Sequence, residues 1–276
     1  MPEGDTVFLT GRLLDEALAG RTLLRGELRH PRLSTVDLAG RVVLGVRSVG
    51  KHLLARFDDG TSLHSHLRMD GAWRVYRPGE RWRGPGHQVR AILATAERTA
   101  VGFRLHDMAL LATRDEVRLV GHLGPDLLDP AWDERLAGEA ATRLGRRADR
   151  EVGLALLDQT VMAGVGNLYR AEVCFLLGVS PWTPVSEVDA GQAVRLAREL
   201  LSRNAWTPAR STTGDSRPAR RHWVYDRAGR PCLRCGAAVR AAPQGHGLDE
   251  RTVYYCPTCQ PGPRPTEPSF ARRRYE

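Results

Sequence analysis

The feature that most constrains the fold of this chain is the pairing of its cysteines. Four of the five cysteines form two Cys-x2-Cys pairs, Cys232 with Cys235 and Cys256 with Cys259, and 20 residues separate the pairs. This spacing predicts a four-cysteine zinc ribbon, in which each pair holds the metal from a tight turn and the stretch between folds as a hairpin. Four thiolates leave no position for water, so we expect the Zn²⁺ to be structural. Two disulfides are the alternative, but the reducing cytoplasm, where we expect this protein, disfavours them.

A cytoplasmic location is expected from two observations. No apolar run approaches membrane-spanning length, and residues 1–5 are acidic, unlike the start of a signal peptide. The fifth cysteine, Cys174, lies among Val173, Phe175 and Leu176. We therefore expect Cys174 to be a buried core thiol.

Two kinds of hydrophobic pattern follow one another along the chain. A helical pattern, which Asp5 and Thr6 can cap, runs to about Ala19. Residues 41–120 then resemble short alternating strands, with Val42, Leu44 and Val46 on one face, and they predict a β-sandwich. The pattern beyond is helical, and two of its helices flank a Gly-containing turn, which is a helix-turn-helix layout. Four helices are expected, over residues 133–143, 151–159, 168–177 and 187–202.

These patterns predict an α+β fold in five parts. They are a β-sandwich with a leading helix over 1–121, a linker over 122–130, a helical domain over 131–221, a four-cysteine zinc finger over 222–260 and a flexible tail over 261–276.

Positive charge predicts a polyanionic partner. The chain has 41 Lys plus Arg against 32 Asp plus Glu, a net charge of +9, which favours nucleic acid. Nine arginines and two aspartates lie between Arg203 and Arg240, together with aromatic residues that include Trp206 and Trp223. Basic residues among aromatics suit a phosphate-contacting surface. A solvated linker is the alternative, but a solvated linker does not require two tryptophans.

One lysine, Lys51, stands among forty arginines. Arginine stays protonated, whereas lysine can release its proton and act as an amine. Lys51 is therefore a candidate for proton transfer, although composition alone favours a surface lysine left by chance.

Several motifs then follow in order along nearly the whole chain. They are Met1-Pro2-Glu3-Gly4, Gly50-Lys51-His52, Ser65–Trp73, Leu156–Gln159 and Gly164–Glu172, followed by the four-cysteine finger. Together they resemble the formamidopyrimidine-DNA glycosylase/endonuclease VIII family of base-excision repair enzymes. The resemblance implies a catalytic N-terminal domain, a helix-two-turn-helix DNA-binding domain and no metal chemistry. The expected partner is damaged double-stranded DNA, and the expected oligomeric state is a monomer.

The resemblance also implies a bifunctional glycosylase/AP lyase that works by β,δ-elimination. Pro2, exposed by removal of Met1, would be the nucleophile that attacks the sugar C1′. An α-amino group has a pKa of roughly 8, so more of it is free amine than of a lysine. Glu3 would be the acid, Lys51 would assist proton transfer in the elimination, and Arg251 would contact the lesion phosphate and assist the second elimination.

Further residues are implied to contact DNA. Asn167 would bind the DNA backbone, and Glu172 would be a carboxylate near the N-terminal amine, with an ion-pairing helix residue as the alternative. After the damaged base is flipped out, Met69 would fill the hole as a wedge. Arg68 would contact the backbone or the opposite base.

Departures from the family pattern bear on the substrate. Asp5-Thr6 stand where the family commonly has Pro-Glu, so a carboxylate near the active site is supplied differently. Residues 102–108 lack the Asp-x-Arg-x-Phe-Gly loop of the purine-lesion branch, which favours the endonuclease VIII branch and oxidised pyrimidines. His66–Met69 is closer to the purine branch, so a purine-lesion glycosylase is one alternative. A non-catalytic DNA-binding protein is another. Ser211–Thr213 could belong to a lesion-reading loop.

Overall fold

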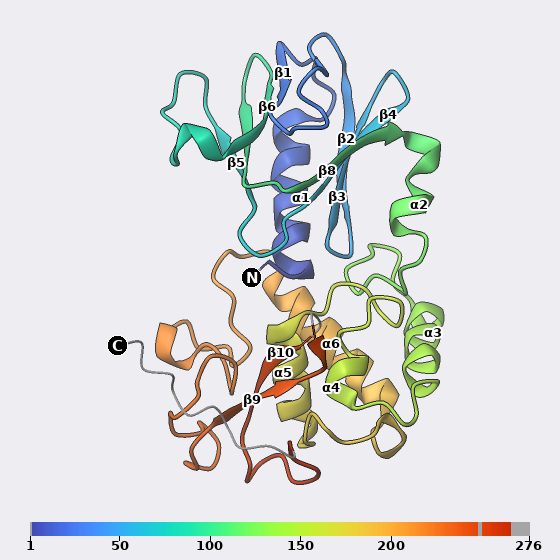
Figure 1. The fold of residues 1–276 in the computed structure, drawn as a ribbon, viewed down its shortest axis with the longest axis vertical. Coiled ribbons are helices and arrows are strands. Elements are labelled where there is room, and N and C mark those ends of the chain that lie inside the picture. Colours follow the sequence, from blue (N-terminus) through green and yellow to red (C-terminus); the bar gives the residue numbers. More distant parts are fainter. Residues whose placement is uncertain (1, 248–249, 266–276) are drawn as a thin grey trace. The chain divides into compact units, whose positions relative to one another are not determined.

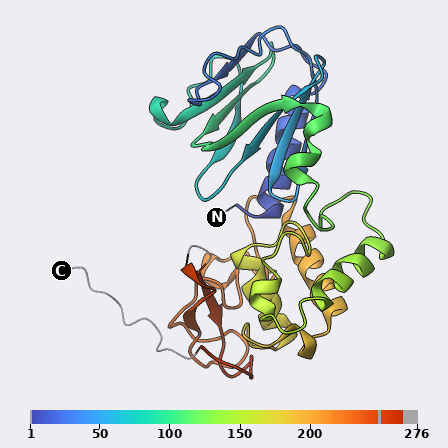
Figure 2. The same cartoon turned by 45° about the vertical axis from the view of Figure 1, so that its right-hand side comes forward.

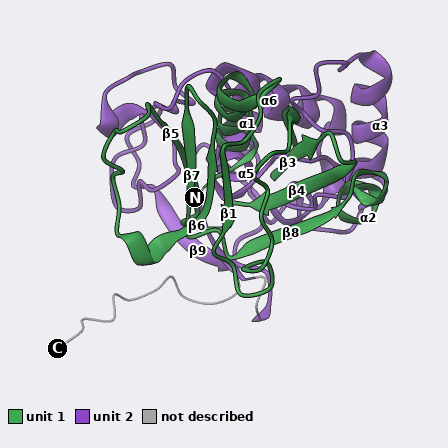
Figure 3. Cartoon of the chain, turned by 90° about the horizontal axis from the view of Figure 1, so that it is seen from above, with its two compact units in different colours: residues 1–122 green, residues 123–276 purple. Residues whose placement is uncertain are grey.

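The computed structural model describes residues 2–247 and 250–265 (Figure 1). The chain divides into two compact units, one up to His122 and one from Leu123 onward (Figure 3). Most of the predicted flexible tail, residues 266–276, lies outside the described residues. Within the described part of the chain, no helix is both long and apolar enough to cross a membrane.

The first unit begins with helix α1, Gly4–Leu18, in agreement with the predicted leading helix. The predicted caps are wrong. Glu3 is the N-cap residue, with an extended backbone and no side-chain capping bond, whereas Asp5 lies inside the first turn. A carboxylate there is favourable because it faces the positive end of the helix dipole.

Two four-stranded antiparallel sheets form the predicted β-sandwich of this unit, in the orders β1-β6-β7-β5 and β2-β3-β4-β8 (Figures 1 and 3). Buried apolar side chains of α1 and of both sheets share one core. A short helix α2, Val117–Val120, follows the last strand. The strands are β1 Arg25–Leu28, β2 Val43–Val49, β3 His52–Phe57, β4 Thr61–His66, β5 Ala72–Tyr76, β6 Val89–Ala94, β7 Thr99–Phe103 and β8 Asp107–Ala112.

The predicted alternation at the start of β2 is wrong in detail. The pairing of β2 with β3 shifts register between Val43 and Gly45. Such a bulge places an extra residue in one strand and reverses the facing of those beyond it. As a result Val43 and Val46 are buried, whereas Leu44 is 62% exposed.

The second unit is helical and ends in a small hairpin (Figure 2). Asp133 caps α3 by accepting a hydrogen bond from the Leu136 amide at 2.9 Å, and Asp189 caps α6 in the same way. Cys174 is fully buried, as predicted, and burial raises the pKa of its thiol to about 12. The elements are α3 Glu134–Gly145, α4 Val152–Ala155, α5 Asn167–Leu177, α6 Ala190–Asn204, β9 Arg240–Gln244 and β10 Arg251–Tyr255.

Only one of the four predicted helices is much shorter than expected. The helix expected over 151–159 ends at Ala155. Beyond it, the Asp158 carboxylate accepts hydrogen bonds from the amide and the hydroxyl of Thr160 at 3.0 and 2.6 Å. An aspartate that bonds its own backbone two residues on competes with the helix and favours a turn.

The predicted hairpin between the cysteine pairs is present as β9 and β10, which pair antiparallel with Gln244 opposite Arg251. Its buried side chains, among them Ala242 and Val253, pack in one cluster with Phe175 of α5 and Val224. The finger therefore packs directly on α5 (Figures 1 and 2).

Candidate active site and metal centre

Lys51 lies in the turn that joins β2 to β3. Val49 pairs with His52, so Gly50 and Lys51 form a two-residue hairpin turn. Gly50 has φ of +57°, a conformation that glycine adopts without steric cost, and glycine at the first central position is typical of such turns. The Gly50-Lys51 sequence thus presents the only lysine at the end of a rigid hairpin.

This turn lies close to the start of α1. Burial lowers the pKa of the Lys51 ammonium below its usual range, while the negative charges of Glu3 and Asp5 act in the opposite direction. Glu3 and Asp5 are each only 1% exposed, and Pro2 is half-buried. The structure therefore gathers Lys51, two buried carboxylates and the first residues of the chain. Asp5, which stands where the family pattern has Pro, adds a carboxylate to this group.

A histidine cluster beside Lys51 was not predicted from the sequence. His52 of β3 lies opposite His66 of β4, and His64 lies two residues before His66 on the same strand. The His52 Nδ1 and His64 Nε2 atoms are 2.9 Å apart, and the His52 ring centroid lies 5.1 Å from each of the other two. Burial is the main cause that lowers the pKa of His52 to about 3 and that of His66 to about 4. At neutral pH these two rings are uncharged. The only sequence signal was the i, i+2 spacing of His64 and His66.

Arg68 and Met69 lie in the turn after β4. Arg68 has φ of +51°, and its guanidinium donates hydrogen bonds from Nε and Nη2 to Asp107 Oδ2 at 3.0 and 2.6 Å. Its backbone amide donates to His66 Nδ1 at 3.0 Å. Met69 is 63% exposed, an unusual state for a methionine. Asp107, which holds Arg68, was not singled out by sequence reasoning.

Arg251 and Asn167 are joined through the hairpin of the second unit. Arg251 is the exposed first residue of β10. Asn167, the first residue of α5, donates from Nδ2 to the Thr252 carbonyl at 2.9 Å. Arg170, also on α5 and fully buried, donates from Nη2 to the Arg251 carbonyl at 3.2 Å. Helix α5 thereby holds the backbone at and beside Arg251.

Glu172, on helix α5, does not form the ion pair that the alternative interpretation expected among the described residues. It is fully buried and accepts hydrogen bonds from the amides of Trp223, Val224 and Tyr225 at 2.8, 2.9 and 2.9 Å. The Thr212 hydroxyl donates a fourth bond. Across the described residues it forms no ion pair, so this carboxylate anchors the segment between α6 and the finger.

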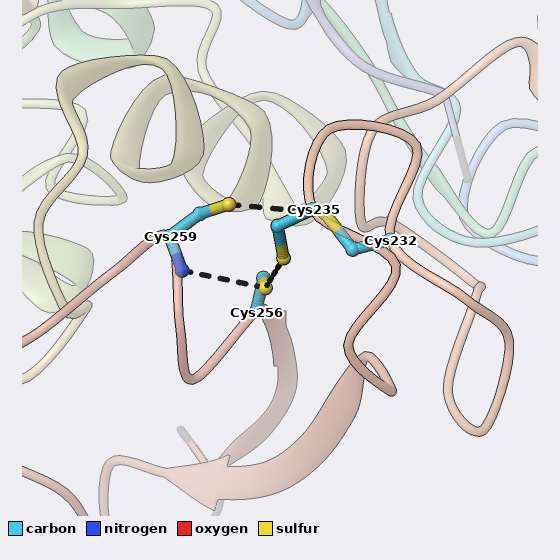
Figure 4. Close-up of side chains that lie close together, drawn as sticks. All are labelled: Cys232, Cys235, Cys256 and Cys259. Atoms are coloured by element: carbon cyan, nitrogen blue, oxygen red, sulfur yellow. Dashed lines mark hydrogen bonds between the residues drawn. The ribbon is translucent and has the colours of Figure 1, made fainter.

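The four cysteines of the finger converge (Figure 4). Their sulfur atoms all lie within 4.8 Å of one another; Cys232 and Cys259 are 3.9 Å apart, and Cys235 and Cys256 are 3.5 Å apart. Tetrahedral Zn²⁺ with Zn–S bonds of about 2.3 Å requires sulfur separations of about 3.8 Å. A disulfide requires about 2.05 Å. The thiols therefore fit a metal and not two disulfides.

Comparison with known proteins agrees with this arrangement. Residues 1–122 match the formamidopyrimidine-DNA glycosylase N-terminal domain, and residues 123–203 match the H2TH domain of the same glycosylase. A solved complex of Lactococcus lactis Fpg with DNA that contains an abasic site has a TM-score of 0.76 and 23% identity, over 95% of this chain and 100% of that one. At that identity the likeness concerns the fold.

The chain belongs to the formamidopyrimidine-DNA glycosylase/endonuclease VIII family. Within this family of enzymes it is endonuclease VIII-like. It is 55% identical over 269 residues to a probable endonuclease 8 2 of Streptomyces coelicolor, covering 96% of each chain. It is 46% identical over 263 residues to the DNA-(apurinic or apyrimidinic site) lyase Nei2 of Mycolicibacterium smegmatis, covering 94% of this chain and 99% of that one.

Proposed function

We propose that this enzyme removes oxidised pyrimidines from double-stranded DNA through an iminium at Pro2 and then cuts the strand by β,δ-elimination. The observation that carries the proposal is the convergence of Lys51 with Glu3 and Asp5 beside Pro2 at the start of α1. A non-catalytic DNA-binding protein has no need to bury two carboxylates around its only lysine.

The proposed reaction assigns roles to Pro2, Glu3, Lys51 and Arg251. The Pro2 nitrogen forms a bond to C1′ while the bond between C1′ and the base breaks, and the nitrogen gives up its proton. The bond between C1′ and the ring oxygen then breaks as the nitrogen lone pair forms the iminium, and Glu3 supplies the proton that the ring oxygen or the base takes up. Loss of a proton from C2′ of the iminium then expels the 3′ phosphate, and a second elimination expels the 5′ phosphate. Lys51 carries protons in these steps, and its lowered pKa makes the neutral amine more accessible. Arg251 contacts the departing phosphate.

Other residues are proposed to hold the DNA. Met69 is exposed enough to enter the stack in place of the flipped base. Arg68, oriented by Asp107, would contact the backbone or the opposite base, and Asn167 would bind the backbone. We also propose that the four cysteines hold one structural Zn²⁺, for which their spacing is suitable, and that the protein works in the cytoplasm, where thiols stay reduced.

Borohydride trapping on a duplex with one abasic site tests the nucleophile. We expect a covalent adduct with the wild-type protein and none with Pro2→Leu, because a bulky second residue prevents removal of Met1. An adduct that persists in Pro2→Leu but disappears in Lys51→Arg would assign the attack to Lys51.

A panel of duplexes with an oxidised pyrimidine or 8-oxoguanine tests the substrate, and preferential release of 8-oxoguanine would favour the purine-lesion alternative.

A further inference from the structure

The side chain of Gln244 connects the finger hairpin to the helical body of the second unit. It is only 2% exposed, and it lies at the end of β9 directly opposite Arg251. Its Oε1 accepts a hydrogen bond from Arg170 Nη1 at 3.1 Å, and its Nε2 donates to Glu151 Oε2 and to the Pro181 carbonyl, each at 2.8 Å. One buried amide therefore bridges α5, the start of α4 and the segment after α5.

The chemistry of this position requires an amide. The group must accept from a buried guanidinium on one side and donate to a carboxylate and a carbonyl on the other. A glutamate would place a second negative charge against Glu151, and a leucine would leave buried polar groups without partners, which is costly. The neighbouring helix also makes room for it, since a Cβ at Gly153 would lie 2.4 Å from Gln244 Oε1.

These contacts meet at the backbone of Arg251. Gln244 pairs with Arg251 across the hairpin, and Arg170 bonds both to the Gln244 amide oxygen and to the Arg251 carbonyl. From this geometry we infer that Gln244 is a positioning residue for Arg251, and that it sets the orientation of the finger arginine for the second elimination. The inference rests on the proposed role of Arg251. Gln244 is buried, and its effect passes through Arg251.

The product pattern on abasic-site DNA tests the inference. We expect Gln244→Leu to lower the ratio of δ- to β-elimination products about tenfold, toward the level of Arg251→Ala. Borohydride trapping, which depends on Pro2, should stay within twofold of wild type, and one equivalent of zinc should remain bound. Gln192→Leu, a matched change at an exposed glutamine on α6, should leave the ratio unchanged. An unchanged ratio in Gln244→Leu, or an equal fall in trapping, would overturn the inference.

A reciprocal exchange keeps the test valid if Gln244→Leu does not fold. Gln244→Glu alone should impair the second elimination, because two carboxylates then face each other. Glu151→Gln combined with Gln244→Glu restores an acceptor toward Arg170 and a donor between the two positions but leaves the Pro181 carbonyl without its donor, so the ratio should recover in part and exceed that of Gln244→Glu. A double variant no better than the single one would contradict the inference.

Hydrogen exchange separates this inference from the proposed role of Arg251. If Arg251→Ala leaves the product ratio unchanged, the role proposed for Arg251 fails. The positioning by Gln244 is then judged on the Arg251 and Thr252 amides, which should exchange at least tenfold faster in Gln244→Leu than in wild type. If these amides exchange at the wild-type rate in Gln244→Leu, Gln244 does not hold this backbone.

Discussion

At the scale of single residues, buried polar side chains specify which distant segments meet. Glu172 collects four donors from residues 212–225, and Gln244 joins three separate segments. Glu116 is a third example, with partners on β2, β3 and β4. A buried carboxylate or amide without partners costs several kcal/mol, so folds that leave these groups unpaired are strongly disfavoured.

Glu116 makes the stability of the first unit depend on pH. Burial alone would raise the pKa of Glu116, but hydrogen bonds from Arg56, Ser62 and Arg47 outweigh it and lower the pKa to about 2. The folded pKa lies below the ordinary value of 4.5, so this stabilisation is complete above that value and is lost as the pH falls toward 2. We expect Glu116→Gln to lower the free energy of unfolding by about 1–3 kcal/mol at neutral pH.

Urea denaturation at a series of pH values measures this effect. The difference in the free energy of unfolding between wild type and Glu116→Gln should shrink as the solution becomes more acidic. A difference that stays constant down to the acid limit would mean that the ionised carboxylate does not stabilise the fold. Glu97→Gln is a suitable control, since that residue is exposed and pairs only at the surface.

Lys51→Arg separates charge from proton transfer. Arginine keeps the positive charge beside the phosphate but does not release its proton near neutral pH. We expect strand cleavage at an abasic site to slow by about 100-fold, within the range for loss of a general acid–base group, while borohydride trapping at Pro2 persists. Single-turnover cleavage and trapping on the same duplex measure the two effects. Cleavage at the wild-type rate would exclude Lys51 as a proton carrier.

At the scale of elements, α5 organises the second unit. Four of its side chains reach the C-terminal region: Asn167 and Arg170 contact β10, Glu172 holds residues 212–225, and Phe175 packs in the finger core. The Phe175 ring also stacks on Trp223 with centroids 5.4 Å apart. A helix that binds two separate segments with polar side chains, and a third with an aromatic one, cannot be recognised by apolar periodicity alone.

The finger should depend on its metal. We expect Cys232→Ser to lose bound zinc and to speed exchange of the β9 and β10 amides, because a hairpin with so small a core has little stability of its own. Zinc content by mass spectrometry and hydrogen exchange measure the two effects. Cys174→Ala, which removes the buried thiol outside the cluster, is the control and should keep full zinc content. Full zinc content in Cys232→Ser would contradict the structural-finger interpretation.

At the scale of the whole molecule, the net charge of +9 favours DNA before any specific contact forms. Part of the basic segment between α6 and the finger is internally neutralised, since Arg217 and Arg220 both pair with Asp215. Arg230 is exposed in the same region and forms no ion pair among the described residues. It is therefore a good candidate for a phosphate contact.

The salt dependence of DNA binding tests this candidate. We expect Arg230→Ala to weaken binding to any duplex and to reduce the slope of log K against log salt by about 0.9, the value for one phosphate contact. Arg98→Ala, an exposed arginine in the turn between β6 and β7, is a charge-matched control. Equal slopes for Arg230→Ala and wild type would remove Arg230 from the interface.

Much of the architecture was predictable because its signals are local. The leading helix, the strands within residues 41–120, three of the four expected helices and the hairpin between the cysteine pairs follow from periodicity and turn residues that act over a few positions, whereas β1 at Arg25–Leu28 was not predicted. The cysteine cluster was predictable for the same reason, since each pair comes from one turn. The bulge at Val43–Gly45 and the early end of α4 were not predictable. In each case two local structures compete, and the hydrophobic pattern does not show which of them is more stable.

The partners of buried polar groups came from tertiary packing. Nothing in the spacing of Glu172 or Gln244 indicates that segments tens of residues away supply their hydrogen bonds. The same holds for the histidines beside Lys51, which meet only because β3 and β4 pair in one register. Local propensity depends on neighbours along the chain, whereas the burial of a polar side chain depends on whichever donors and acceptors the folded chain brings to it. The sequence therefore specified most of the elements and the four-cysteine cluster, and packing specified how those elements hold the site.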